Sequence, residues 1–226
     1  MERQDLYKSS PVRFFDDIAN GGLKGGALGL ITAKKGVGKT SVLVQFGIDA
    51  LLEGKQLVHV SFDQHSSNVI TWYESIFSEI AKKKNLGDVT ELRDEVIRDR
   101  TILNFNQETF TLPKVIGTLK ALKEGGIKVA AIVVDGLNLD TVSAADIESV
   151  ASFVKAEKIT AWFSDTKAGA ALNENLRAEL QPYFSIVAHL AAQQNEIVLS
   201  VLSLEGKTDC GGAINLDPKT LLMCRT

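Results

Sequence analysis

A lysine and two hydroxyl side chains follow a short glycine-rich run, a combination that can bind phosphate. Lys39, Thr40 and Ser41 come directly after Gly38, and an apolar, strand-like stretch at 27–32 precedes the run. Backbone N–H groups of such a turn, with the positive end of the following helix, form a concave anion site. The lysine ammonium then reaches the β- and γ-phosphates of a nucleotide, and the threonine hydroxyl holds Mg²⁺. The pattern predicts a phosphate-binding loop formed by Ala33, Lys34, Lys35, Gly36, Val37, Gly38, Lys39, Thr40 and Ser41.

Two positions of this loop carry further expectations. Ala33 stands where the general pattern has glycine, and alanine is costly there only if the position needs a positive φ. Lys39 is a candidate catalytic residue as well as a binding residue, because its charge faces the phosphates that react.

A carboxylate that could share the metal ion lies at the end of a second apolar run. Residues 129–134 are all valine, alanine or isoleucine, and Asp135 follows them. An uninterrupted apolar run suits a central strand of a parallel sheet covered on both faces. In proteins with a phosphate loop, an acid at such a strand end typically holds the metal, often through a water. Thr40 and Asp135 are therefore the predicted Mg²⁺ ligands, although Asp135-Gly136 is also a common turn pair.

Polar residues also follow the apolar run at 57–62. Asp63 and Gln64 stand at its end, and ligands of open α/β sheets sit outside the carboxyl ends of strands. Both are candidate catalytic residues that orient or activate the attacking water. The alternative is that Asp63 only caps the next helix, and a lone loop histidine such as His65 is most often solvated.

Strand-like and helical patterns alternate along most of the chain, which indicates a layered α/β fold with a parallel sheet. After Tyr183 the connections shorten, which indicates antiparallel strands at one sheet edge. We expect one domain over 1–226, with 1–12 as a flexible N-terminal segment. The predicted strands are 28–32, 57–62, 102–105, 129–134, 159–163, 185–190, 196–204 and 220–223, and the predicted helices are 40–52, 68–83, 88–100, 112–123 and 144–155.

The composition of the chain limits the classes of protein to which it can belong. The chain has 226 residues, 45% of them hydrophobic, and a net charge of −3. This acidic balance argues against a dedicated nucleic-acid surface. Only Cys210 and Cys224 are present, which favours a reducing compartment, so we expect a cytoplasmic protein. No apolar run approaches the roughly 18 residues of a membrane span, and the N-terminus lacks the apolar core of a signal peptide.

The segments around the loop resemble the RecA-like ATPases, particularly the KaiC, RadA and DnaB-helicase branch. The resemblance implies a three-layer RecA-like P-loop NTPase fold, with a mainly parallel central sheet and antiparallel C-terminal strands. It also implies ATP and Mg²⁺ as ligands and a homo-oligomer, such as a hexameric ring, whose sites are completed across subunit boundaries; a protein partner is a further possibility. The segments that carry it are FDDI at 15–18, GGL at 21–23, GALGLI at 26–31, QF at 45–46 and VSFD at 60–63.

Two departures from that family pattern bear on activity. KaiC-like domains commonly have Glu-Glu where this chain has Asp63 and Gln64. A late strand of the family often carries Lys-x-Arg that reaches the neighbouring subunit's site, whereas here Lys207 is present and the arginine is absent. A cation supplied in trans can be worth ~10³ in rate. Both departures predict slow hydrolysis or a nucleotide-dependent switch; the alternative for Lys207 is an ordinary turn lysine.

Other functions remain open on the sequence. The loop is one substitution from the Lys-Gly-Gly-Val-Gly-Lys-Thr of ParA/MinD proteins, although Lys35 replaces a glycine and Ser61 lacks their carboxylate. A non-hydrolysing nucleotide sensor or a partner-docking module would also fit Asp63 and Gln64. A DNA motor is disfavoured, because the lysines at 82–84 are more simply a solvated helix end.

Overall fold

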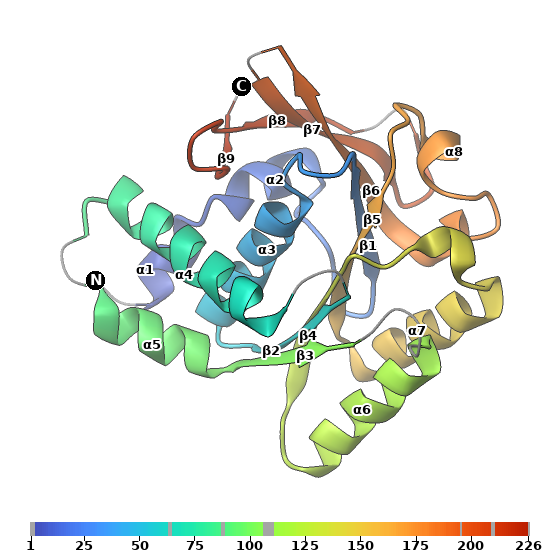
Figure 1. Cartoon of the computed structure of the whole chain (residues 1–226), viewed down its shortest axis with the longest axis horizontal. Coiled ribbons are helices and arrows are strands. Elements are labelled where there is room, and N and C mark those ends of the chain that lie inside the picture. Colours follow the sequence, from blue (N-terminus) through green and yellow to red (C-terminus); the bar gives the residue numbers. More distant parts are fainter. Residues whose placement is uncertain are drawn as a thin grey trace.

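Nine strands form one sheet with helices on both faces (Figure 1). The computed structural model describes residues 3–62, 65–86, 89–105, 111–194, 196–208 and 211–225. Within them the strand order is β3-β2-β4-β5-β1-β6-β7-β8-β9. The strands are β1 (Leu28–Ala33), β2 (Gln56–Ser61), β3 (Arg100–Asn104), β4 (Val129–Asp135), β5 (Thr160–Thr166), β6 (Phe184–Gln193), β7 (Glu196–Leu204), β8 (Ala213–Leu216) and β9 (Met223–Cys224).

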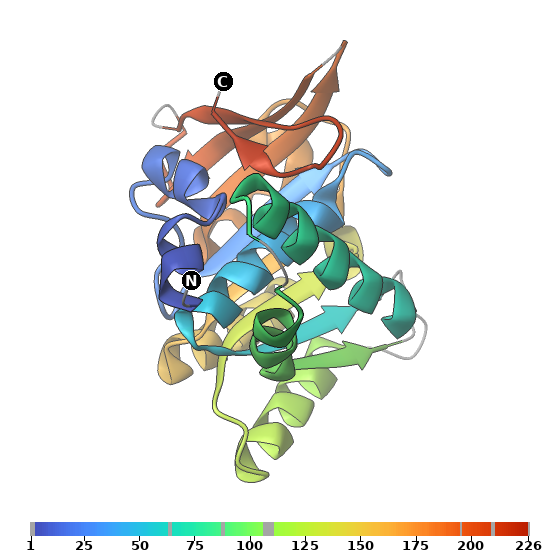
Figure 2. The ribbon, with the colours of Figure 1, turned by 90° about the vertical axis from the view of Figure 1, so that its left-hand side faces the viewer.

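The helices divide into two groups, one on each face of the sheet. Helices α1 to α5 contribute to one buried apolar cluster, and α6 and α7 contribute to the other. Figure 2 shows α4 and α5 on the near side of the sheet and the C-terminal strands at its upper end. The helices are α1 (Arg3–Lys8), α2 (Val12–Ile18), α3 (Lys39–Glu53), α4 (Ser66–Lys83), α5 (Thr90–Arg98), α6 (Leu112–Glu124), α7 (Ala144–Glu157) and α8 (Leu172–Asn175), with single 3₁₀ turns at Leu139–Thr141 and Gln181–Tyr183.

The sheet confirms the predicted fold class. Strands β3, β2, β4, β5, β1 and β6 are parallel, and β7, β8 and β9 add to the β6 edge in antiparallel fashion. A helix lies in each connection between successive parallel strands, as parallel pairing requires.

The C-terminal third differs from expectation in three details. The run predicted at 185–190 is part of β6 and pairs in parallel with β1, because residues 167–183 carry the chain back across the sheet. Strand β8 was not predicted. The strand predicted at 220–223 is wrong for most of its length, since only Met223 and Cys224 form β9. Leu221 has a left-handed φ of 57°, which no strand residue adopts.

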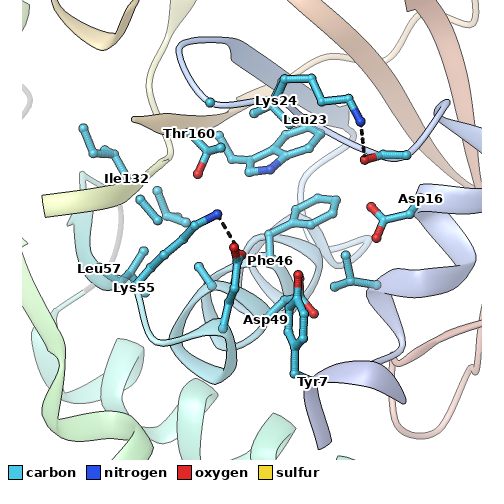
Figure 3. A pocket seen from close by; sticks show the side chains of 18 of the residues that line it. Tyr7, Asp16, Leu23, Lys24, Phe46, Asp49, Lys55, Leu57, Ile132 and Thr160 are labelled. Carbon is cyan, nitrogen blue, oxygen red and sulfur yellow. Dashed lines mark hydrogen bonds and ion pairs between the residues drawn. The ribbon is translucent and has the colours of Figure 1, made fainter. Parts of the chain in front are cut away.

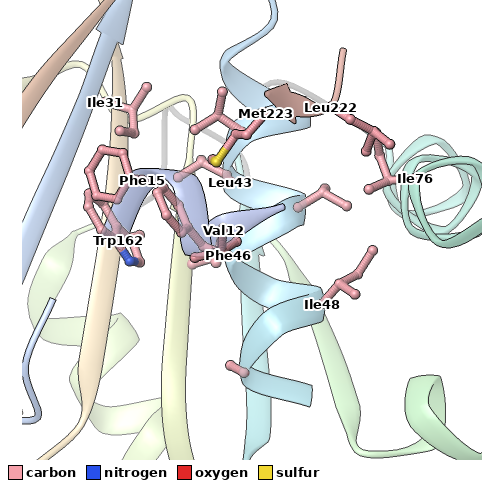
Figure 4. Close-up of a cluster of buried hydrophobic side chains, with 14 of the residues drawn as sticks. Val12, Phe15, Ile31, Leu43, Phe46, Ile48, Ile76, Trp162, Leu222 and Met223 are labelled. Carbon is pink, nitrogen blue, oxygen red and sulfur yellow. The ribbon is translucent and has the colours of Figure 1, made fainter. Parts of the chain in front are cut away.

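An aromatic stack ties α2 and α3 to the sheet (Figure 4). The rings of Phe46 and Trp162 are stacked with centroids 4.1 Å apart, and Phe15 meets Trp162 edge-on at 5.6 Å. Gly29 makes room for this stack, because a Cβ there would lie 2.4 Å from the indole. The stack thereby fixes α3, whose first turn carries the lysine and hydroxyls of the predicted loop.

The first helix lies against the rest of the domain. Arg3–Lys8 forms α1, which packs against α3, and Leu6 is fully buried. The Arg3 guanidinium donates to the Leu51 carbonyl from Nε at 3.0 Å and lies 3.3 Å from Asp99. The buried Leu6 side chain and the contacts of the Arg3 guanidinium thus hold residues 3–8 against the domain. In the described part of the chain, no helix combines the length and apolar character needed to cross a membrane.

Candidate functional site

The predicted loop connects the end of β1 to the start of α3. Gly36 and Gly38 have φ angles of 82° and 124°, values that favour glycine. Ala33 is instead the last residue of β1 and pairs with Thr166 and Leu190 on the neighbouring strands. The position does not need a positive φ, so alanine is accommodated there without strain.

Thr40 and Asp135 meet at the mouth of this loop. The Thr40 hydroxyl donates to Asp135 Oδ2 at 2.7 Å, although the two residues are 95 positions apart. The two come together because β4 and β1 are parallel strands of one sheet, and their carboxyl ends lie at the same edge. The Lys39 ammonium is also nearby, since it donates to the Ala33 carbonyl at 3.3 Å. A cation and two hard oxygen donors therefore converge beside the glycine turn.

Ser164, on β5, fixes the Asp135 carboxylate. Its hydroxyl donates to Asp135 Oδ1 at 2.6 Å and accepts from the Gly136 N–H at 2.9 Å. Ser164 is fully buried and Asp135 is 3% exposed. With Oδ1 engaged by Ser164, Oδ2 is the oxygen that faces Thr40. Sequence reasoning missed Ser164, and the available signal was its place near the end of a predicted strand.

A cavity of about 470 Å³ opens in front of these groups. This size is within the range of small-molecule and cofactor sites. Its lining includes most of the predicted loop and three residues that sequence reasoning did not assign to the site: Trp72, Thr166 and Leu221. The full lining is Lys35, Gly36, Gly38, Lys39, Thr40, Trp72, Asp135, Thr166 and Leu221.

Some loop side chains point elsewhere. Val37 packs against the apolar cluster beneath the loop, and the buried Ser41 hydroxyl donates to the Leu221 carbonyl at 3.2 Å. Burial lowers the pKa of His189, and the nearby Lys34 ammonium acts in the same direction. Asp63 and Gln64 lie outside the described residues, so their role with the attacking water stays a prediction.

A buried histidine lies on β2, the strand next to β4. His59 Nδ1 and the Tyr73 hydroxyl are 3.0 Å apart, and both residues are fully buried. Burial lowers the pKa of His59 to about 4, and the Arg100 guanidinium acts in the same direction. The Asp135 carboxylate opposes both but does not overcome them. His59 is therefore neutral at neutral pH.

A second cavity, of about 270 Å³, lies near the amino ends of β1, β2 and β5 (Figure 3). Its cations are engaged by neighbouring oxygens: Arg13 by Asp16 at 2.9 Å and by Asp49, Lys55 by Glu53 at 2.7 Å, and Lys24 by the Gly21 carbonyl at 2.9 Å. It is lined by the later turns of α3 rather than by the first turn, and it lies away from the carboxyl ends of the strands. The cavity beside Lys39 is therefore the better phosphate site.

The family comparison agrees with this geometry. A family model described as "ATPase: KaiC" matches residues 9–172, which is well over half of the chain. The chain belongs to the KaiC ATPase family. No curated protein matches it. Membership places this KaiC-family chain among the RecA-like P-loop proteins that bind ATP, and it favours the KaiC resemblance over the ParA/MinD one. The matched residues include the loop, Asp135 and Ser164, whereas β6 to β9 lie beyond them.

Proposed function

We propose that this KaiC-family chain binds ATP with Mg²⁺ in the cavity beside Lys39, and that it is a slow ATPase or a nucleotide-dependent switch acting through assembly. The observation that carries the proposal is the 2.7 Å approach of the Thr40 hydroxyl to Asp135. Both are oxygen donors of the kind that Mg²⁺ prefers. When bound there, Mg²⁺ would neutralise charge on the β- and γ-phosphates.

The other steps of nucleotide binding and hydrolysis are assigned to residues of the chain. The N–H groups of the turn and of the first turn of α3 would hold the phosphate oxygens, and the Lys39 ammonium would add a point charge. Ser164 keeps the Asp135 carboxylate in one orientation through the 2.6 Å hydrogen bond. Water activation falls to Asp63 and Gln64 in this proposal. Lys207 is left out of it as an ordinary turn lysine, in keeping with slow hydrolysis.

Binding experiments test the site assignment. We expect Lys39→Ala to lose most of its affinity for ATP. We expect Thr40→Ala and Asp135→Asn to bind ATP no more tightly in Mg²⁺ than in EDTA. Equal ATP affinity in the parent and Lys39→Ala would refute the site. Asp94→Asn is a matched control, because this carboxylate on α5 is 62% exposed and lies outside the cavity lining.

The second candidate is a sensor that binds ATP without hydrolysing it. The substitution of Asp63 and Gln64 for paired glutamates favours it, since aspartate has a shorter reach than glutamate. Single-turnover kinetics separate the two functions: phosphate release at the rate of family ATPases excludes a pure sensor. Loss of release in Asp63→Asn with ATP affinity retained would assign the water-activating role to Asp63.

Assembly is the remaining part of the proposal. Family members often oligomerise, and we propose a homo-oligomer, such as a hexameric ring, that forms or rearranges with ATP. Sedimentation of the chain with ATP and with EDTA tests this directly; a monomer under both conditions refutes it. A protein partner and a cytoplasmic location, the latter from the low cysteine content, belong to the same proposal, whereas a nucleic-acid partner is disfavoured by the net charge of −3.

A further inference from the structure

The second cavity, near the amino ends of β1, β2 and β5, contains residues that the nucleotide site does not use. The segments FDDI at 15–18 and GGL at 21–23 are prominent in the sequence, yet neither lines the cavity beside Lys39. Asp16, Gly21 and Leu23 of these segments line the second cavity instead, together with the later turns of α3. Its volume of about 270 Å³ lies just below the usual range for drug-sized ligands, which suits a small metabolite.

One wall of this cavity is acidic. Asp16, near the end of α2, and Asp49, on α3, share the Arg13 guanidinium: Nη1 lies 2.9 Å from Asp16 Oδ2, and Nη2 contacts Asp49 Oδ2. Burial raises the pKa of both carboxyl groups although Arg13 opposes it, so a single guanidinium compensates the pair only in part. Lys24 is exposed at the rim, where its ammonium donates to the Gly21 carbonyl at 2.9 Å. A further cation would therefore be stabilised at this wall.

The glycines of the GGL segment leave room for the Asp16 carboxylate. A Cβ on Gly22 would lie 2.1 Å from Asp16 Oδ1, and Gly22 has a φ of 72°. The Gly21 N–H donates to the Asp16 carbonyl at 2.8 Å and closes the turn after α2. Figure 3 shows the Asp16 carboxylate pointing into the cavity. The turn thus holds one carboxylate where a ligand in the cavity can reach it.

Lys55 brings a cation to the other side of the same cavity. It lies in the turn between α3 and β2, and Figure 3 shows its ammonium pointing inward from the side opposite Asp16. The ammonium lies 2.7 Å from Glu53, and the two side chains are 32% and 38% exposed. Water screens an ion pair so exposed, and such pairs contribute little to stability. A carboxylate in the cavity can therefore replace Glu53 as the partner of Lys55 at little cost.

Trp162 adds a buried hydrogen-bond donor to the lining. The residue is 6% exposed, and its indole N–H has no hydrogen-bond partner within the described part of the chain. The Phe46 ring is stacked on the indole, and Gly29 lies against its six-membered ring, so the N–H edge is left to border the cavity. Figure 4 shows the indole nitrogen turned away from Ile31. Because a buried tryptophan N–H usually has a partner, this donor indicates a ligand with an acceptor group.

We propose that this cavity binds a small zwitterion of the α-amino-acid type, with its ammonium at Asp16 and its carboxylate at Lys55 and the Trp162 N–H. One ligand then supplies both the cation for the acidic wall and the acceptor for the indole. A phosphate ion would instead face the carboxylates of Asp16 and Asp49, and a metal ion offers no acceptor. The site is separate from the cavity beside Lys39, and the inference does not depend on ATP binding there.

Thermal unfolding of the full chain tests the ligand class. The probe is an equimolar mixture of the standard α-amino acids. Two comparison mixtures contain the same amino acids N-acetylated, which lack the ammonium, and as amides, which lack the carboxylate. We expect the free amino acids to raise the unfolding midpoint, since a ligand of the folded state stabilises it, and neither comparison mixture to do so. No shift with the free amino acids, or an equal shift with either comparison mixture, would overturn the proposal.

Three variants locate the bound amino acid. The amino acid that gives the largest shift alone is titrated by calorimetry into the parent, Asp16→Asn, Lys55→Met and Trp162→Phe. Each variant removes one hydrogen bond to a charged group of the ligand and should weaken binding about tenfold or more. Trp162→Phe keeps a ring for Phe46 to stack on, and Lys55→Met removes only an exposed ion pair. These two variants therefore test the site even if Asp16→Asn folds poorly.

Two matched controls change the same kinds of side chain outside the cavity lining. Asp17, next to Asp16, is 64% exposed, and Lys123 is 58% exposed and pairs with Glu157. Asp17→Asn and Lys123→Met should bind the amino acid as the parent does. If Lys55→Met and Trp162→Phe also bind it as the parent does, or if the controls weaken binding as much as these variants, the assigned site is wrong.

Discussion

Replacing Ser164 by alanine tests whether this hydroxyl prepares Asp135 for a metal ion. The variant removes two buried hydrogen bonds, one to the Asp135 carboxylate at 2.6 Å and one from the Gly136 N–H at 2.9 Å. A bond to a charged group is worth about 1.5–3 kcal/mol and a neutral one about 0.5–1.5 kcal/mol. Because Ser164 is fully buried, water cannot readily replace the hydroxyl. We expect the free energy of unfolding to fall by about 2–4 kcal/mol.

The functional effect is separable from the loss of stability. With Oδ1 released, the carboxylate can rotate, and the gain in ATP affinity that Mg²⁺ gives over EDTA should fall by about tenfold. Urea unfolding in EDTA gives the stability, and titration calorimetry with ATP in Mg²⁺ and in EDTA gives the metal-dependent gain. Ser164→Thr keeps the hydroxyl and should retain more of that gain than alanine does.

Ser143→Ala is the matched control for this experiment. Ser143 makes the same pair of contacts at the start of α7, accepting from the Asp146 N–H at 3.1 Å and donating to its carboxylate at 2.7 Å, but on the exposed surface. Losing this helix cap should cost about 1 kcal/mol and leave the Mg²⁺ gain unchanged. If Ser164→Ala keeps both the parent's stability and its Mg²⁺ gain, the positioning role assigned to Ser164 is wrong.

Three other predictions concern the domain that holds the site. Gly29→Ala should lower the free energy of unfolding by about 1–3 kcal/mol, because the added Cβ would lie 2.4 Å from Trp162. Gly117→Ala in α6 is the control, since no atom lies within 4 Å of its added Cβ. In the same urea titration it should raise the free energy of unfolding by about 0.5–1 kcal/mol. The pKa of His59 is about 4 in the folded chain, against an ordinary value of 6.5. Between these two pH values the unfolded chain binds more protons, so the free energy of unfolding should fall by up to about 3 kcal/mol as the pH drops through them. An equally steep fall in His59→Gln, measured in EDTA, would contradict this. Leu6→Ala should cost about 2–5 kcal/mol, and an unchanged urea midpoint would show that α1 does not stabilise the domain.

The loop and the sheet class were predictable because their signals are local. Gly36, Gly38 and Lys39 lie within a few residues of the strand and helix that they connect, so turn chemistry and hydrophobic pattern identify them together. Asp135 was identified for a similar reason, since an apolar run that ends in an acid places the acid at a strand end. The structure brings it to Thr40 through the strand order, which the sequence indicated only by the alternation of strands and helices.

The rest of the site depends on contacts between distant segments. Ser164 precedes Asp165, and no local pattern distinguishes which of the two turns toward Asp135. Trp72 belongs to the helix predicted at 68–83, and an apolar position at helical spacing does not show that part of its surface borders a cavity. Leu221 was placed in a strand because Leu221 and its neighbours are apolar, whereas the turn at Asp217 and the pairing with Gln45 give it a left-handed φ.

The outermost strand at the C-terminal edge limits how copies of this chain can join. At that edge of the described sheet β9 has two residues. A strand so short offers few unpaired backbone groups for a neighbouring chain to extend, and natural sheets use this device against edge-to-edge aggregation. At this edge, copies of the chain would therefore be held by side chains of helices and loops, whose contacts can loosen and re-form, rather than by extension of the sheet.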